Sequence, residues 1–270
     1  RTKLAEEYDL NNQLIIGRDN TLINTNNLRL WLRLNTTLAN LSNYDSSTIS
    51  SIAYDGTPSI NENDQIGRKT YPSALFDNTD NVNGLVTFTG VNNLTTFTNG
   101  SQDLPFSISF FYRRNSATAS GDTEYFFYKG DPDALNTDEF YCFYNHASQI
   151  MFLNLEDEAE NQSKYKTVGI QLQNDVWNHI VITVQFGNNA DQDIQFYVNG
   201  NLITNTLNAV QESNYSSINA VSDTLVVGAN RTGNFEADGY FSEFTVWDKT
   251  LTATEVSALY YATIEGWKAK

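Results

Sequence analysis

The densest group of ionisable side chains in the sequence is the acidic segment LEDEAEN. It contains Glu156, Asp157, Glu158 and Glu160. Glycoside hydrolysis needs two carboxyl groups that face a common cleft, one acting as acid and the other as base or nucleophile. These four carboxylates instead follow one another beside a polar run, which is typical of a solvated hairpin tip. We therefore expect a protein that is not an enzyme, with glycosidase as the least favoured reading.

The two histidines and the one cysteine give no catalytic arrangement. His179 follows Trp177 at the beginning of an apolar run, so we expect it to pack and to hydrogen bond, and His146 falls in the turn-like segment YNHASQ. No Ser/His/Asp set has a recognisable spacing, and no glycine-rich phosphate loop occurs. Cys142 lies among aromatic residues and is expected to be an inert buried thiol. A single cysteine also excludes an intrachain disulfide.

Two acidic loops could offer oxygen ligands to calcium, which binds carboxylates, amides and carbonyls. The segment FDNTDN contains Asp77, Asp80 and Asn81, which are candidate ligands for a single calcium ion together with loop carbonyls. Ordinary Asx turns are the favoured alternative. The second loop, GDPDALNTDE, contributes three aspartates whose spacing does not fit an EF-hand. We expect those to be solubilising: Asp131, Asp133 and Asp138.

Sugar recognition would need exposed aromatic rings next to amide or carboxylate groups. Several aromatic residues have polar, loop-like neighbours: Tyr44, Tyr54, Tyr71, Phe235, Tyr240 and Trp267. The chain has 15 tyrosines, so most are expected to fill the core, and the pattern alone does not identify a ligand-binding residue.

Composition limits the classes of partner. The 270 residues carry a formal net charge of −16, which repels phosphate backbones and anionic membranes. No run of about 18 apolar residues occurs, so no membrane insertion is expected. Hydrophobic residues make up 40% of the chain, enough for a sizeable core.

The periodicity predicts an all-β protein. Leu28, Leu30, Leu32 and Leu34 alternate with Arg29, Trp31 and Arg33, the pattern of a half-buried strand. The polar stretch 35–72 is expected to be a long loop or insertion. One helix is predicted, because Thr252 and Glu255 form a capping box before an apolar stripe. Short strand-like runs fill the rest: ALF, LVTFT, FSISFFYRR, EYFFYKG, EFYCFYN, QIMFLNL, TVGIQL, WNHIVITVQFG, DIQFYVNG, TLVVG and GYFSEFTVW.

Several of these motifs, in order, resemble the laminin-G-like, concanavalin-A-like jelly rolls, a superfamily that includes the pentraxins. DVWNHIVITVQ is similar to the family's "gxWhHvAvty", DIQFYVNGNLI to its "lxlYvDGkxv", and LVVGANR…GYFSEFTVWDKTLTATEV to its final strands and helix. Trp177 and Trp247 are then expected to fill the gap between the sheets. Asn199 and Gly200 would form a type I′ turn, and Gly239 would allow a close approach.

The resemblance implies a two-sheet antiparallel jelly-roll sandwich over residues 28–262, with an N-terminal arm (1–27) and a C-terminal tail (263–270). It places Asp80 and Asn81 where pentraxins have a calcium pair. The pentraxin acidic triplet falls on Ala229, Asn230 and Arg231, so a double-calcium site is not expected.

For function, we expect an extracellular binding or adhesion module on a cell or virion surface that recognises glycan or a protein partner. The alternative is a structural assembly or decoration subunit of a capsid, fibre or surface layer, joined to neighbouring subunits through residues 1–27.

Overall fold

The structure, a computed structural model, describes residues 13–16, 21–24, 27–32, 51–55, 59–66, 69–76, 85–91, 95–116, 123–130, 138–157, 163–220, 224–230 and 235–265. The described elements are β1 (Gln13–Ile16), β2 (Thr21–Asn24), β3 (Leu28–Leu32), β4 (Ser51–Asp55), β5 (Ser59–Ile66), β6 (Lys69–Phe76), β7 (Leu85–Thr89), β8 (Phe106–Arg114), β9 (Thr123–Gly130), β10 (Asp138–Asn145), β11 (Ile150–Glu156), β12 (Ser163–Gly169), β13 (Asn178–Val184), α2 (Ala190–Asp193), β14 (Ile194–Val198), β15 (Asn201–Leu202), β16 (Thr206–Gln211), β17 (Thr224–Val227), β18 (Gly239–Trp247) and α3 (Ala253–Glu265).

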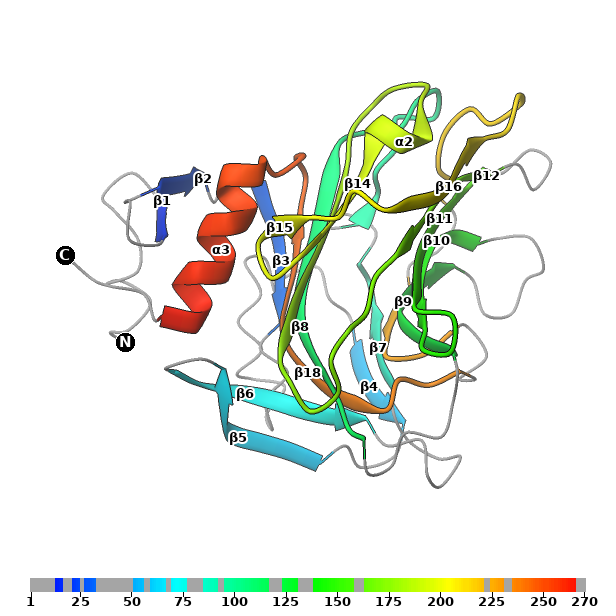
Figure 1. Ribbon diagram of the computed structural model, residues 1–270. Coiled ribbons are helices and arrows are strands. Elements are labelled where there is room, and N and C mark those ends of the chain that lie inside the picture. The colour runs from blue at the N-terminus through cyan, green and yellow to red at the C-terminus, as the bar shows by residue number, and fades with distance from the viewer. Residues whose placement is uncertain are drawn as a thin grey trace.

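Two antiparallel sheets face each other, which confirms the predicted sandwich. The front sheet has the order β16-β12-β11-β10-β9-β17-β7-β4, and the back sheet has the order β15-β14-β13-β8-β18-β6-β5, with β3 also paired to β18. Helix α3 lies against the outer side of the back sheet, and the β1–β2 hairpin lies beside that helix (Figure 1). The outer side of the front sheet is therefore the side remote from α3. Neither helix in the described part of the chain is long and apolar enough to span a bilayer.

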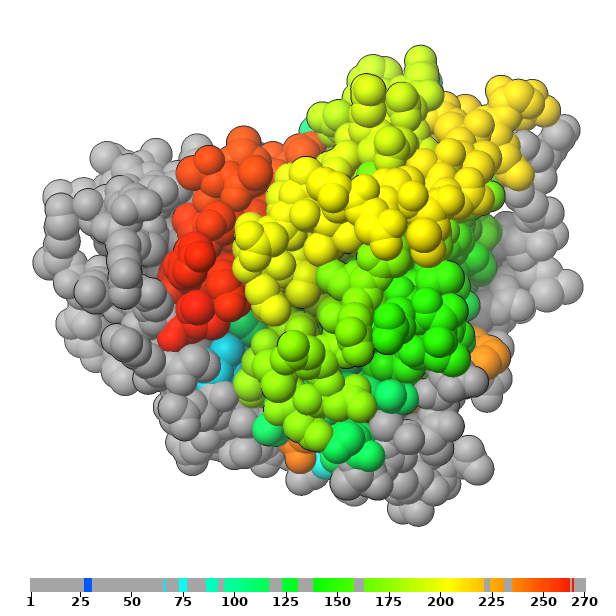
Figure 2. All heavy atoms as spheres, viewed as in Figure 1, coloured from blue at the N-terminus to red at the C-terminus, as the bar shows by residue number. Residues whose placement is uncertain are grey.

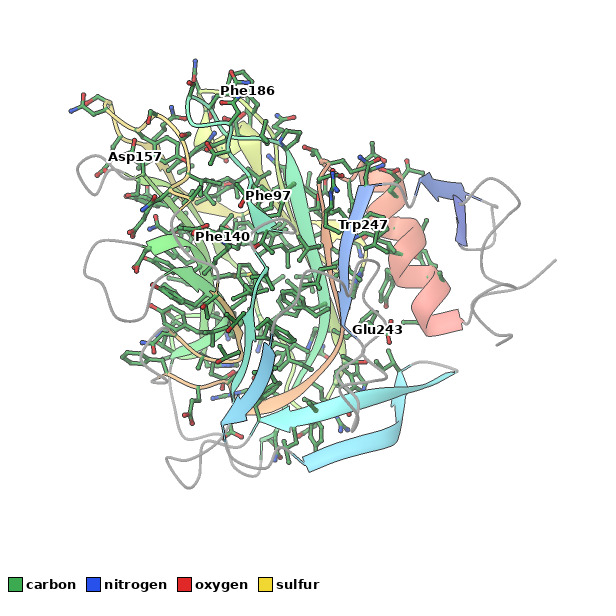
Figure 3. All side chains as sticks on the ribbon, turned by 180° about the vertical axis from the view of Figure 1, so that it is seen from behind. Phe97, Phe140, Asp157, Phe186, Glu243 and Trp247 are labelled. Carbon is green, nitrogen blue, oxygen red and sulfur yellow. The ribbon has the colours of Figure 1, made fainter. Side chains whose placement is uncertain are left out.

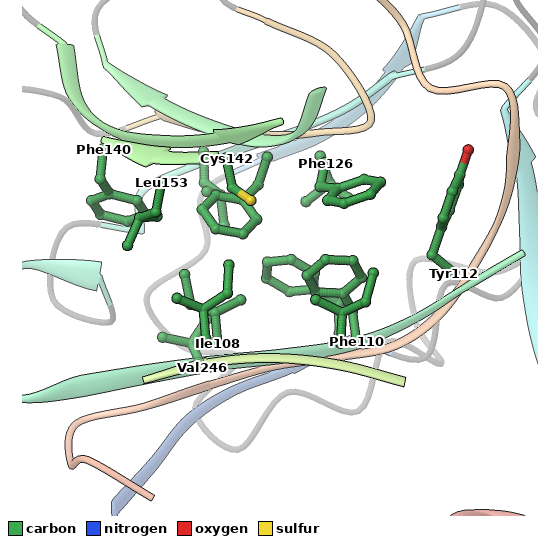
Figure 4. Close-up of a cluster of buried hydrophobic side chains, with 14 of the residues drawn as sticks. Ile108, Phe110, Tyr112, Phe126, Phe140, Cys142, Leu153 and Val246 are labelled. Atoms are coloured by element: carbon green, nitrogen blue, oxygen red, sulfur yellow. The ribbon is translucent and has the colours of Figure 1, made fainter. Parts of the chain in front are cut away.

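Aromatic side chains dominate the core between the sheets. Ile108, Phe110 and Val246 of the back sheet point toward Phe126 and Cys142 of the front sheet (Figure 4). Each of these side chains is at most 1% exposed, and burying one such group stabilises the fold by roughly 1.5–3 kcal/mol. Burial also raises the pKa of the Cys142 thiol well above its ordinary value, in agreement with the predicted inert thiol.

The predicted role of the two tryptophans is wrong. Trp247 is buried, but it packs with Leu28 and Val256 on the outer side of the back sheet, under α3 (Figure 3). Trp177 is half-buried beside Phe111, on the same outer side. Side chains alternate between the faces of a strand, and Val246 takes the inward position next to Trp247. Phenylalanines fill the intersheet space instead.

Three local predictions are confirmed. The backbone N–H of Thr252 donates to Glu255 Oε2 (2.9 Å), and the N–H of Glu255 donates to Thr252 Oγ1 (3.2 Å), which caps α3. Asn199 (φ 51°) and Gly200 (φ 77°) form the two-residue turn between β14 and β15. A Cβ on Gly239 would lie 2.5 Å from a backbone carbonyl oxygen of β8, so only glycine fits there.

The long polar stretch is not all loop, which corrects the prediction for 35–72. Strands β4 and β5 and the beginning of β6 lie within it. β4 is an edge strand of the front sheet and β5 is an edge strand of the back sheet. Edge strands are often polar because one of their edges faces solvent. Apolar and polar residues alternate too weakly in SINENDQI to indicate strand β5 from the sequence. The short helix α2 was also not predicted, and α3 ends at Glu265, beyond the expected boundary at 262.

Candidate functional site

Aromatic side chains cover the outer side of the front sheet, and all of them except the buried Tyr128 are partly or largely exposed. We call this surface the aromatic face. Its rings come from four adjacent strands and from the segment before β18, and they contact one another in sequence across the sheet. The members are Tyr125, Tyr128, Tyr141, Phe143, Phe152, Tyr165 and Phe235.

Five of the rings form a continuous row perpendicular to the strands. Neighbouring centroids are 5.5 Å apart for Tyr165 and Phe152, 4.9 Å for Phe152 and Phe143, and 5.3 Å for Phe143 and Tyr125. Phe235 completes the row 6.1 Å from Tyr125. Phe143 lies directly opposite both Phe152 and Tyr125 in the strand register, so the sheet itself fixes these contacts.

Phe235 has two properties that are unusual for an aromatic residue. Its side chain is 57% exposed, and its backbone adopts φ 53°, a left-handed conformation that is strained for a bulky residue. The Phe235 carbonyl accepts a hydrogen bond from the backbone N–H of Tyr125 (2.9 Å), which holds this conformation against β9. The fold thus presents a large apolar ring to solvent at the end of the row.

The hydroxyls of Tyr125 and Tyr141 keep their protons at neutral pH, because both pKa values are raised above the ordinary value. Burial raises the pKa of Tyr125 and of Tyr141, and the carboxylates of Asp138 and Glu156 raise both further. A protonated phenol is both donor and acceptor. The face therefore combines apolar rings with hydroxyl groups that can form hydrogen bonds.

Amide side chains lie among the rings. Asn208 Nδ2 donates to the hydroxyl of Tyr165 (3.2 Å), and Asn154 Nδ2 donates to Glu156 Oε1 (2.7 Å). These amides come from β16 and β11, on the same outward-facing positions as the rings. Aromatic rings with interspersed amides and hydroxyls are suited to a ligand that has both apolar C–H surface and hydroxyl groups.

The acidic segment LEDEAEN does not behave as the predicted solvated tip. Asp157 is 3% exposed and accepts hydrogen bonds from the backbone N–H (2.8 Å) and Oγ (2.9 Å) of Ser216. It fastens the chain beyond β16 to the end of β11. Glu158 and Glu160 lie outside the described residues.

Of the three aspartates in the other acidic loop, only Asp138 is described, and it accepts a hydrogen bond from the hydroxyl of Tyr128. Asp138 is therefore part of the border of the aromatic face rather than merely solubilising. Asp131 and Asp133 lie outside the described residues.

The structure places both histidines in packed positions with polar partners. His179 is buried, stacks on Phe111 (4.5 Å between centroids) and has Nε2 2.8 Å from Ser109 Oγ. This confirms the predicted packing and hydrogen-bonding role. His146 lies in the β10–β11 turn, as predicted, with Nε2 2.9 Å from Glu124 Oε2.

The predicted calcium ligands Asp77, Asp80 and Asn81 lie outside the described residues. Within the described ranges, no group of three or more His, Cys, Asp or Glu side chains could hold a metal ion. Ala229, at the place of the pentraxin triplet, is fully buried and has no side-chain oxygen. Calcium binding by Asp77, Asp80 and Asn81 stays a prediction.

Of the aromatic residues singled out from the sequence, Phe235 and Tyr240 have described side chains, and Phe235 belongs to the aromatic face. Tyr240 lies on the opposite sheet, where its ring contacts Arg113 (4.2 Å from the guanidinium carbon) and Trp177. Tyr44 and Trp267 lie outside the described residues, as do the side chains of Tyr54 and Tyr71.

The other rings of the face lie in strands, whereas the aromatic residues singled out from the sequence were chosen for their loop-like neighbours. The available signal was an aromatic residue at an outward-facing position in each of four consecutive strands. Such positions alternate with core positions, as Tyr141 and Phe143 alternate with Cys142. Strand order was needed to see that these positions are neighbours.

Comparisons with known proteins agree with the sandwich fold. A family model described as the concanavalin A-like lectin/glucanases superfamily matches residues 80–257. No curated protein sequence matches the chain.

Similar solved structures include binding domains of botulinum neurotoxins. The binding domain of neurotoxin DC in complex with rat synaptotagmin II is 16% identical, with a TM-score of 0.62, covering 88% of this chain and 52% of that one. The same domain in complex with SialylT is 17% identical (TM-score 0.59; 88% and 52% covered). The serotype G binding domain is 18% identical (TM-score 0.60; 87% and 51% covered).

The chain spans about half the length of these structures. At such low identity the likeness shows a shared fold, the jelly-roll sandwich. The family match covers well over half of the 270 residues. The chain therefore belongs to the concanavalin A-like lectin/glucanase superfamily.

Proposed function

We propose that the protein is a non-enzymatic binding module that recognises an extended, uncharged glycan through the aromatic face. The observation that carries this proposal is the row of five rings that ends at the strained, exposed Phe235. Strain in a backbone is retained where the surrounding structure holds it, often at a binding site.

The chemistry of the row suits a sugar chain. Each pyranose has one side made of C–H groups, which packs on an aromatic ring, while its hydroxyl groups need hydrogen-bond partners. The hydroxyls of Tyr125 and Tyr141 and the exposed amide of Asn208 supply such partners between the rings. A row several rings long favours a chain of sugars over a single one.

The charge of the molecule favours an uncharged glycan. The net charge is −16, and Asp138 and Glu156 border the aromatic face. An anionic polysaccharide would be repelled at long range and at contact. The proposal includes an extracellular location, on a cell surface or the exterior of a virion. The acidic composition and the lectin-like fold support this location.

Binding to a panel of soluble uncharged polysaccharides, measured by affinity electrophoresis, tests the proposal. Replacing Phe235 with alanine removes one ring and should weaken binding about tenfold or more, equivalent to about 1.4 kcal/mol or more. Phe186→Ala is the matched control, because Phe186 is 54% exposed and does not contact the row. It should bind as the unchanged protein does.

Three results would contradict the proposal: binding to no polysaccharide, equal weakening by both variants, or tighter binding to anionic chains. A protein partner would then be favoured, as would the assembly role for residues 1–27, most of which lie outside the described residues.

A further inference from the structure

A pocket of about 370 Å³ opens at one end of the sandwich. It lies where β8 ends, beside the β10–β11 turn and the segment that follows β12. The turn and that segment lie side by side on the surface (Figure 2). The lining residues are Arg114, Tyr144, His146, Gln149, Gln171, Leu172, Gln173 and Asn174.

A buried carboxylate supports the pocket. Glu124 is 1% exposed, and its Oε1 accepts a hydrogen bond from Arg114 Nε (3.0 Å). The hydroxyl of Tyr112 donates to Glu124 Oε2, and His146 Nε2 lies 2.9 Å from the same oxygen. Glu124 thus fixes Arg114 and compensates its charge, so this guanidinium is not an unpaired cation that awaits an anion.

The two loops that form the walls are fastened to each other. The hydroxyl of Tyr144 donates to the Ile170 carbonyl (2.9 Å) and accepts from the Leu172 N–H (3.1 Å). The Gln149 carbonyl accepts from the Ile170 N–H (2.8 Å), and Gln149 itself adopts φ 56°. The strained turn and these bonds fix the backbone of the pocket before any ligand arrives.

Four carboxamide side chains line the walls, those of Gln149, Gln171, Gln173 and Asn174. A carboxamide both donates and accepts hydrogen bonds, as a sugar hydroxyl does. Leu172 and the edge-to-face pair of Tyr144 and His146 (4.4 Å between centroids) add apolar surface. The chemistry of the pocket therefore matches a small ligand with many hydroxyl groups and no charge.

We propose that this pocket is a second binding site, which holds one or two uncharged sugar units at the end or branch of a glycan. Its volume lies near the lower limit of ligand pockets, roughly 300–1,000 Å³, so a longer chain does not fit inside. The site is built from other residues than the aromatic face. It stands even if the aromatic face binds no glycan.

The test is a titration of the protein, followed by NMR, with uncharged mono- and disaccharides: glucose, galactose, N-acetylglucosamine, maltose, lactose and cellobiose. Parallel titrations with glucuronic acid and inorganic phosphate test whether the pocket binds anions instead. We expect saturable shifts at the backbone amides of 145–149 and 170–174 with at least one uncharged sugar, and none with the anions.

The double variant Gln171→Ala/Gln173→Ala should weaken that binding at least tenfold, because both side chains are exposed at the pocket and their loss leaves the fold intact. Gln185→Ala/Gln192→Ala is the matched control at the opposite end of the sandwich, next to α2 (Figure 1), and should change nothing. Phe235→Ala should leave sugar binding in the pocket unchanged, which separates this site from the aromatic face.

The proposal is overturned if none of these sugars gives saturable shifts at the pocket, if only an anion does, or if the double variant binds as well as its control.

Discussion

The ring of Phe235 lies against the ring of Tyr125, with centroids 6.1 Å apart and planes inclined by 33°, and the Tyr125 N–H donates to the Phe235 carbonyl. One hydrogen bond and one ring contact thus join a loop before the last strand to the middle of the front sheet. Without this pair, the row of aromatic rings would end at β9.

Replacing Phe235 with glycine should separate binding from stability. Glycine adopts φ 53° without strain, so the folded state should lose little or gain up to about 1 kcal/mol. The exposed ring contributes little burial, and its removal should still weaken glycan binding. Thermal unfolding measures the change in stability, and affinity electrophoresis measures the change in glycan binding. A large fall in melting temperature would show that the ring is needed for folding rather than for binding.

Lys164 should be essential to stability. It is fully buried, with Nζ 2.8 Å from Asp193 Oδ2, 3.8 Å from Asp103 Oδ2 and 3.0 Å from the Gly187 carbonyl. Lys164→Met would leave two buried carboxylates without their cation, and we expect a loss of about 3–5 kcal/mol in urea unfolding.

The control for Lys164 is Lys249→Met, because the Lys249–Glu255 pair is partly exposed and should contribute less than about 1 kcal/mol. Adding Asp193→Asn to Lys164→Met should recover part of the lost stability. Equal effects of the two lysine variants would refute the argument from burial.

The sequence predicted the sandwich because the strand runs carry alternating or continuous apolar residues, and it predicted α3 because Thr252 and Glu255 mark its beginning. It did not predict β5, whose polar residues suit an outermost strand. It could not predict the aromatic face or the pocket, because both depend on which strands are neighbours. Arg114, His146 and Gln173 are distant in the chain, and only the pairing of β8 with β13 and of β10 with β11 brings them together.

The calcium hypothesis for Asp77, Asp80 and Asn81 predicts a stability change. Binding to the folded state alone would add about 2.7 kcal/mol at a calcium concentration a hundredfold above Kd, and should raise the melting temperature by several degrees. Asp80→Ala should abolish the rise, and magnesium should not reproduce it because it demands stricter geometry. Identical melting curves in calcium and in chelator would end the hypothesis.

His179 should make the protein less stable in mild acid. Burial lowers its pKa to about 3 in the folded state, compared with 6.5 for an ordinary histidine. Between these two values the unfolded chain binds a proton that the folded protein does not bind. The stability contribution is therefore complete above pH 6.5 and is lost as the pH falls toward 3.

We expect this single group to lower the free energy of unfolding by about 2 kcal/mol between pH 7 and pH 5. His179→Gln keeps an amide that can bond to Ser109 Oγ and does not titrate, so its unfolding free energy should fall less over the same interval. At pH 8 neither His179 nor its glutamine replacement is charged. The difference in unfolding free energy between the two proteins at this pH therefore reports the change in packing alone. Urea unfolding at several pH values measures both slopes. Parallel slopes would mean that His179 gains its proton in the folded protein as readily as in the unfolded chain, contrary to its burial between Phe111 and Tyr260.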